Sequence, residues 1–183
     1  MYYSSQEDPQ PILHLINICP KCGFAAYTAD FNMLDFDLQK IKQAIAKIEK
    51  FSSRKATKFN AGDGYLEINE YLDNLSLEKK LAIQLQASYA YRELKDENLK
   101  KVRQHILKTL EEILRKKAFN QNPEEFYLYL IGEIHRLLGN DKESFRYFKQ
   151  ILLKVDKNSL ISKITQNQLS NPGEIIPNEI FKV

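Results

Sequence analysis

The stretch YLYLIGEIHRLLGNDKESFRYF, Tyr127–Phe148, decides the fold of this chain. Its apolar residues recur at intervals of three and four, which predicts two helices, and Gly139 between them suits the left-handed conformation that ends a helix. Gly132 and Ser144 are small residues, one on each predicted helix, so the two helices can approach closely there. Phe148 follows Ser144 by four residues and can fill the layer behind. The stretch therefore predicts a helical hairpin packed through a seam of small residues.

A second hairpin precedes this one. YRELKDE, Tyr91–Glu97, aligns with HRLLGND, His135–Asp141, at an offset of 44 residues. The surrounding sequence predicts helices over about residues 76–94 and 97–118, from the apolar periodicity. The later hairpin resembles the tetratricopeptide (TPR) pattern, although the offset exceeds the 34 residues of a standard repeat. We therefore expect a mainly α fold of TPR-like antiparallel helical hairpins, with a short N-terminal CxxC knuckle and extended segment.

The predicted organisation has three parts. Residues 1–33 form the extended segment and knuckle, residues 34–156 the TPR-like helical domain, and residues 157–183 a polar, partly disordered tail. The helical domain begins with an amphipathic helix and a basic, Gly-containing loop over Ser52–Gly64. The apolar stripe of that first helix comprises Leu34, Leu38, Ile41, Ile45 and Ile48.

Composition agrees with a helical protein that has its own core. Of the 183 residues 43% are hydrophobic, while only six are Gly and six Pro. The net charge of +3 is not the concentrated positive field of a dedicated nucleic-acid binder. The N-terminus lacks a signal-peptide pattern, and no segment approaches the roughly 20 apolar residues of a membrane-spanning helix. We expect a cytoplasmic protein that does not engage membranes.

Three blocks, in this order, resemble an uncharacterised bacterial family with a zinc-ribbon-like head followed by TPR-like helices. They are PILHLINICPKCGFAAYTADF (Pro11–Phe31), LQASYAYRELKDE (Leu85–Glu97) and the Tyr127–Phe148 stretch. Members of the family carry a further CxxC pair before the one seen here. The resemblance therefore implies a four-cysteine zinc site, of which this sequence contains one half, and it implies no activity.

Both cysteines lie in Cys19-Pro-Lys-Cys22-Gly23, the spacing of a zinc knuckle. A closed structural zinc site needs four ligands. His14 is the candidate third ligand, although an extended segment would place it on the face opposite Cys19. Three interpretations stay open: a zinc site, including one shared between two copies; a metal-free reduced or disulfide-bonded pair; and a thiol redox role.

A groove is the best candidate for binding. In TPR-like hairpins the first helix of each pair lines the concave surface, so arginines and tyrosines from two hairpins could clamp a carboxylate or an extended peptide. The alternative is that each arginine caps carbonyl groups at the end of its own helix. The predicted groove residues are Leu85, Tyr89 and Arg92 on the earlier hairpin and Tyr129, Glu133 and Arg136 on the later one.

The predicted function is a non-enzymatic module that binds a protein or peptide, with a vestigial or partial zinc knuckle, zinc as its candidate cofactor and a homodimer as a candidate assembly. A first alternative is a zinc-knuckle nucleic-acid-binding protein. A second, less favoured alternative is a CxxC thiol oxidoreductase, because the sequence lacks the βαβ pattern of thioredoxin-like enzymes. The nucleic-acid alternative depends on three basic clusters, Arg54-Lys55-Lys58, Lys100-Lys101-Arg103 and Arg115-Lys116-Lys117.

Overall fold

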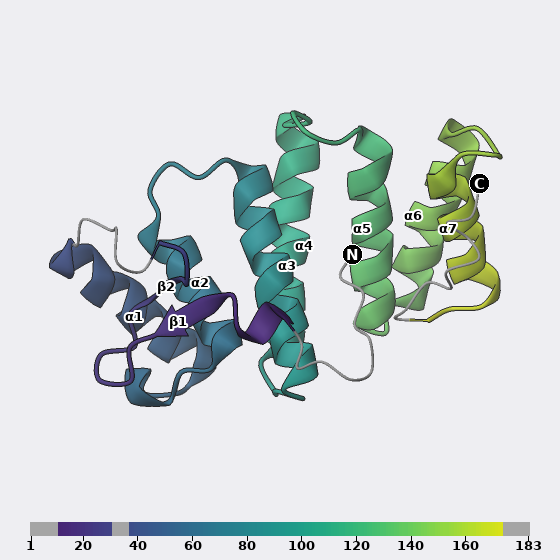
Figure 1. Ribbon diagram of the computed structural model, residues 1–183. Coiled ribbons are helices and arrows are strands. Elements are labelled where there is room, and N and C mark those ends of the chain that lie inside the picture. The colour runs from purple at the N-terminus through teal and green to yellow at the C-terminus, as the bar shows by residue number, and fades with distance from the viewer. Residues whose placement is uncertain (1–10, 31–36, 174–183) are drawn as a thin grey trace. The chain divides into compact units, whose positions relative to one another are not determined.

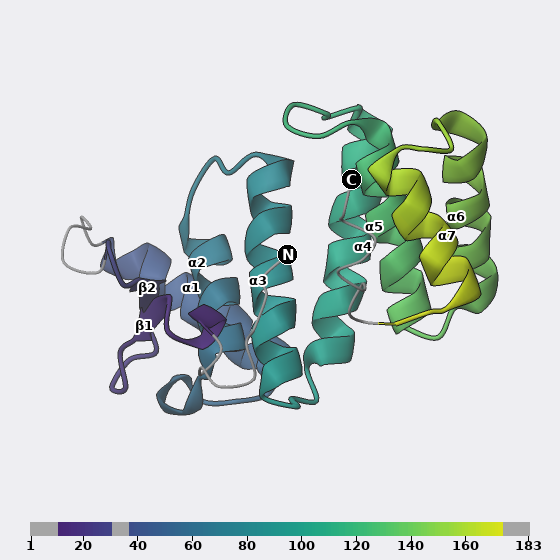
Figure 2. The ribbon, with the colours of Figure 1, turned by 45° about the vertical axis from the view of Figure 1, so that its right-hand side comes forward.

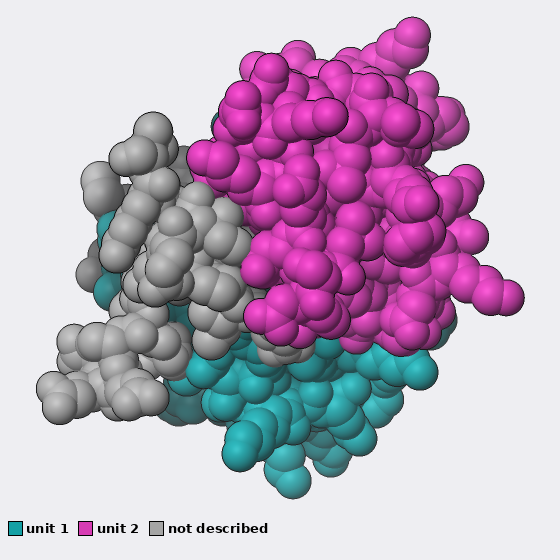
Figure 3. Space-filling view, turned by 90° about the vertical axis from the view of Figure 1, so that its right-hand side faces the viewer, with its two compact units in different colours: residues 1–105 teal, residues 106–183 magenta. Residues whose placement is uncertain are grey.

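A computed structural model of the chain describes residues 11–30 and 37–173 (Figure 1). The described residues are mainly helical, as predicted, with helices α1 to α7 and one two-stranded sheet. The chain divides into two compact units, residues 1–105 and 106–183, coloured separately in Figure 3. This boundary lies within helix α4 (Leu99–Lys116) and differs from the three parts that the sequence predicts.

The first unit is a small hairpin of strands on a group of helices. Strands β1 (Ile16–Ile18) and β2 (Ala25–Tyr27) pair antiparallel and follow a 3-10 turn, η1 (Pro11–Leu13). Both strands contact α2 (Ala61–Tyr71), which also packs against α1 and α3 (Figure 1). The flanking helices are α1 (Leu38–Ser52) and α3 (Leu77–Glu93).

Helix α2 starts earlier than the sequence predicts, so the predicted loop over Ser52–Gly64 is wrong for its last four residues. The Asn60 side chain accepts the N–H of Asp63, and the Asp63 carboxylate accepts the N–H of Asn60, which forms a capping box. Gly64 lies under β1, where a Cβ atom would come within 2.7 Å of Ile16 Cδ1. The glycine therefore allows close packing of strand on helix and does not mark a turn.

The second unit contains the hairpin that the sequence predicts, followed by one more helix. Helices α5 (Glu124–Leu137), α6 (Asp141–Lys154) and α7 (Leu160–Ser170) lie side by side (Figure 2). A Cβ atom on Gly132 would lie 2.6 Å from Phe148 Cε1, and Ser144 is buried, so the small-residue seam is confirmed. The buried core of this unit comprises Leu128, Tyr129, Phe148, Ile151 and Ile164.

Helix α7 lies in the segment for which the sequence predicts a polar, partly disordered tail. The Ser159 side chain accepts the N–H of Ser162 and caps the helix, while Ile164 and Gln168 are buried.

The later part of the tail, residues 174–183, lies outside the described residues, as does Leu34 of the predicted first stripe. Leu38 is 69% exposed, so the buried stripe of α1 begins at Ile41. Within residues 11–30 and 37–173, every helix is too short or too polar to cross a bilayer.

Candidate functional site

The CxxC turn joins β1 to β2 in the first unit. The Cys19 N–H donates to the Phe24 carbonyl at 2.8 Å, and the Gly23 N–H donates to the Cys19 carbonyl at 2.8 Å. Gly23 has φ +82°, a conformation that residues with a side chain rarely adopt, and a Cβ there would lie 2.6 Å from Ala56 Cβ. The chain therefore turns tightly enough to hold both thiols on one short loop, with Cys19 half-buried and Cys22 exposed.

The two thiols differ in acidity because their surroundings differ. Backbone N–H groups of Cys22 and Lys21 donate to the Cys19 sulfur and lower the pKa of that thiol, with a smaller contribution from the Lys21 charge. Partial burial raises the pKa of the Cys22 thiol, although its sulfur receives the N–H of Phe24. Cys19 is therefore the more readily ionised of the pair, and backbone donors point at both sulfurs.

The two cysteines of one chain are the right kind of ligand for zinc, but a structural zinc site needs four ligands. Thiolates are preferred zinc ligands, and structural zinc sites have four of them or a mixture with histidine. Among residues 11–30 and 37–173, no three His, Cys, Asp or Glu side chains lie together so that they could hold a metal ion. His14 is exposed, and its carbonyl accepts the Thr28 hydroxyl at 3.1 Å. The prediction that His14 completes the site beside Cys19 and Cys22 is therefore wrong within a single chain.

A buried carboxyl group beneath the turn was not predicted. Glu67 on α2 is fully buried, and its Oε2 accepts the N–H of Ala25 at 3.0 Å. Its Oε1 has no hydrogen-bond partner in the described part of the chain. Burial raises the pKa of Glu67 to about 8, and a charge on Glu67 would in turn raise the pKa of the Cys22 thiol. Glu67 follows Asp63 by one turn within a wholly buried stretch of α2, and nothing in the apolar periodicity distinguishes it.

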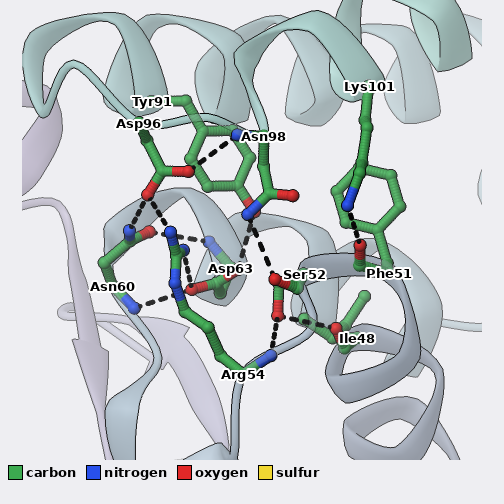
Figure 4. A network of polar contacts seen from close by, with 10 residues as sticks. All are labelled: Ile48, Phe51, Ser52, Arg54, Asn60, Asp63, Tyr91, Asp96, Asn98 and Lys101. Atoms are coloured by element: carbon green, nitrogen blue, oxygen red, sulfur yellow. Dashed lines mark hydrogen bonds and ion pairs between the residues drawn. The ribbon is translucent and has the colours of Figure 1, made fainter.

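A polar network joins the end of α1, the start of α2 and the turn after α3 (Figure 4). Arg54 contacts two buried carboxylates, Asp63 at 3.0 Å and Asp96. The Asn60 amide donates to Asp96 at 2.7 Å, and the Tyr91 hydroxyl donates to Asp63 at 2.7 Å. Each charge that these contacts describe has a partner of opposite sign, so the network stabilises the first unit.

The network also changes how the predicted basic clusters are interpreted. Arg54 is occupied by two carboxylates and does not form a free basic surface. Lys101 donates to the Phe51 carbonyl at 3.1 Å, and its ammonium lies 6.0 Å from the centre of that ring. In the third cluster, Lys116 pairs with Glu112 at 2.6 Å. Each cluster thus contains a cation that is engaged within the chain.

The first unit brings together the groove residues that the sequence predicts on the earlier hairpin. Leu85, Tyr89 and Arg92 are half-buried and follow one another on α3 at helical spacing. The Arg92 guanidinium lies 5.4 Å from the centre of the Tyr89 ring and bonds the Glu93 carboxylate at 2.8 and 3.0 Å. The arginine is therefore held in place by its neighbours on the same helix.

The second unit brings together only two of its three predicted groove residues. Tyr129 is 6% exposed and stacks on Phe148 with ring centres 5.7 Å apart, so it belongs to the core and the prediction that it faces a groove is wrong. Glu133 and Arg136 are adjacent on α5 and bond at 2.7 and 2.8 Å. Arg136 also donates to the carbonyl of Gly173 at 3.0 Å.

Gly173 lies just after α7, and both its carbonyl and its N–H form hydrogen bonds with side chains. Its carbonyl accepts the Gln168 amide at 2.8 Å in addition to Arg136, and its N–H donates to Gln168 Oε1 at 3.0 Å. Gln168 is itself buried. A buried amide and an anchored arginine thus form a small site for the backbone of a non-helical segment, which the sequence did not reveal because Gln168 lies in the predicted tail.

A protein-family model matches residues 2–171, and its description is "uncharacterized protein conserved in bacteria (DUF2225)". The resemblance to an uncharacterised bacterial family is therefore confirmed. No curated protein matches the chain, and no solved structure matches it either.

Proposed function

The chain belongs to the bacterial family DUF2225, whose description assigns no activity. From the geometry of the chain, we propose that it is a non-enzymatic module that binds an extended segment of another protein. In this proposal the helical hairpins are TPR-like, and their first helices carry the binding residues. The proposed contact point is the half-buried pair Glu133–Arg136 on α5, within the second unit. The pair Tyr89–Arg92 on α3 is a separate candidate within the first unit.

The observation that carries the proposal is the bond from Arg136 to the backbone carbonyl of Gly173. Glu133 holds the guanidinium in a fixed orientation, and the side chain of Arg136 is only 17% exposed. A preoriented guanidinium donates to a carbonyl or carboxylate with little further loss of conformational entropy. The surface of α5 therefore already binds peptide backbone in a non-helical conformation, which is the chemistry that extended-peptide recognition requires.

The test is a screen of the full chain against an array of synthetic peptides about twelve residues long. We expect a subset to bind, and their affinity to fall at least tenfold in Arg136→Ala because a charge-assisted hydrogen bond contributes about 1.5–3 kcal/mol. Arg146→Ala is the matched control, since Arg146 also pairs with a glutamate three residues before it but is 64% exposed on α6. A panel in which no peptide binds, or in which both variants bind equally well, would overturn the proposal.

Salt dependence separates this proposal from nucleic-acid binding. Peptide binding through one arginine should change little between about 50 and 200 mM salt, whereas a protein that makes many phosphate contacts loses about 10³-fold or more in affinity over that range. In each of the three basic clusters at least one cation, Arg54, Lys101 or Lys116, already bonds a group within the chain, which favours peptide binding over nucleic-acid binding. Binding of a single-stranded oligonucleotide with a steep salt dependence would support the nucleic-acid alternative instead.

A further inference from the structure

The segment that follows α7 already occupies the surface of α5 where we place the bound peptide. Helix α7 ends at its C-cap Asn171, and residues 172–173, here called the strap, continue the chain in a non-helical conformation. The Gly173 carbonyl accepts a hydrogen bond from the Arg136 guanidinium at 3.0 Å, although the two residues lie 37 positions apart in sequence. The strap therefore joins the end of α7 to α5 within the second unit.

The contacts that hold the strap use its backbone. Gln168 accepts the N–H of Gly173 at 3.0 Å and donates to the Gly173 carbonyl at 2.8 Å, and the same carbonyl accepts the bond from Arg136. The Gln168 amide thus bonds both the N–H and the C=O of one residue, as a residue of a neighbouring strand does in an antiparallel ladder. Any extended peptide with a free N–H and C=O can form the same bonds.

Burial of the site favours an exchange of one backbone for another. Gln168 is 3% exposed, so release of the strap with no replacement would leave its amide without these two bonds in a largely buried position, which is costly. Glu133 orients Arg136 through two further bonds that do not involve the strap. The side chains of the site therefore stay in place for a second backbone that forms the bonds the strap gives up.

We propose that the strap is an internal ligand, which competes with the partner segment for Arg136 and Gln168 and has to be displaced before that segment binds. This inference rests on the proposed function and adds its regulation. Because the strap belongs to the same chain, its effective concentration at the site is high. The apparent Kd of the partner is then the intrinsic Kd divided by the fraction of chains whose strap is released.

Gly173→Pro weakens the strap and leaves every side chain of the site unchanged, because proline lacks the N–H that Gln168 accepts. The peptides that bind the full chain most tightly in the array should bind this variant about two- to tenfold more tightly, as expected when the competing state loses one hydrogen bond. Asn171→Ala is the control, since Asn171 is exposed and its backbone bond to Asn167 is kept. It should bind the peptides as the original chain does.

Hydrogen exchange of the Gly173 amide measures strap release in the original chain, so it stays decisive if Gly173→Pro does not fold. Arg136→Ala should accelerate this exchange about tenfold, because a bond from a charged group is lost, while the amide of Ile131 within α5 should be unchanged. Arg146→Ala, the exposed counterpart on α6, should leave the Gly173 rate as it is. A bound peptide should also accelerate Gly173 exchange, because it displaces the strap.

The outcomes separate the strap from the function on which it rests. Equal affinity of the peptides for the original chain and Gly173→Pro would overturn the strap and leave the proposed function standing. The same holds if Gly173 exchange is unchanged by Arg136→Ala or by bound peptide. If no peptide binds either chain, the proposed function is overturned and the role of the strap with it.

Discussion

The buried carboxyl of Glu67 gives the sharpest prediction about stability. In the folded chain, burial raises its pKa from the ordinary 4.5 to about 8. Between these values the unfolded chain has lost the proton and the folded chain still binds it, so the free energy of unfolding falls as pH rises. The free energy of unfolding falls by about 1.4 kcal/mol per pH unit in this range. Between pH 4.5 and 8 it therefore falls by about 4 kcal/mol in total. That is a large fraction of the 5–15 kcal/mol by which typical domains are stable.

Glu67→Gln removes the titration and keeps an oxygen that can accept the Ala25 N–H. Urea unfolding, followed by circular dichroism at several pH values from 5 to 8, should show a difference between variant and original chain that grows with pH in favour of the variant. His135 contributes the opposite slope, because burial lowers its pKa and its stabilisation is lost as pH falls, but it contributes equally to both proteins. Comparison of the two proteins therefore isolates Glu67.

Glu70→Gln is the control, since Glu70 lies on the same helix but at the surface, where it pairs with Lys47 at 2.7 Å. That variant should follow the original chain within about 0.5 kcal/mol at every pH, as expected for an exposed ion pair. A carbon-13 NMR titration of the Glu67 carboxyl reads its pKa directly. Parallel pH profiles for the original chain and Glu67→Gln, or a carboxyl that titrates near 4.5, would refute the reasoning.

Two further variants test the packing of each unit by thermal and urea unfolding. Gly132→Ala should cost about 1–3 kcal/mol, because the added methyl would lie 2.6 Å from the ring of Phe148, whereas Gln150→Ala on the exposed side of α6 should change little. Arg54→Ala should cost about 3–5 kcal/mol, because it leaves two buried carboxylates without their cation, whereas Lys47→Ala should cost under about 1 kcal/mol. Equal losses in either matched pair would contradict the assigned contacts.

The helical hairpin of the second unit was predictable because its signals are local. The apolar periodicity of α5 and α6, the glycine at 139 and the small residues at 132 and 144 all lie within one stretch of 22 residues. Gly139 has φ +79°, as its position predicts. The TPR alignment, however, predicts that Tyr129 faces a groove. The TPR pattern describes a two-helix hairpin, so it does not take account of a third helix, α7, that packs against the hairpin. In the structure α7 supplies Ile164 to the core that Tyr129 shares.

Capping patterns show the limit of local signals. Asn122 with Glu125 and Asn140 with Glu143 both match the capping-box spacing, yet α5 begins after Pro123 and the Asn140 side chain contacts His135 at 3.4 Å. Neither N-cap residue, Pro123 nor Asn140, makes a side-chain cap bond. The spacing is necessary for a capping box but does not fix the backbone conformation of the first residue, and Asn140 has φ −93° and ψ 62°.

The capping box that does form, Asn60 with Asp63, was hidden in a segment whose glycines predict a loop. Gly62 and Gly64 are in fact helical, and each lies where another element approaches: the Tyr91 ring on one side of α2 and strand β1 on the other. Two glycines that flank an acidic residue can therefore indicate a helix packed on both sides as well as a turn. The choice between the two depends on side chains 28 or more residues away, such as the Tyr91 hydroxyl that bonds Asp63. Glu67, one turn after Asp63, accepts the N–H of Ala25, which lies 42 residues away on β2, so its raised pKa follows from packing and not from its neighbours in sequence.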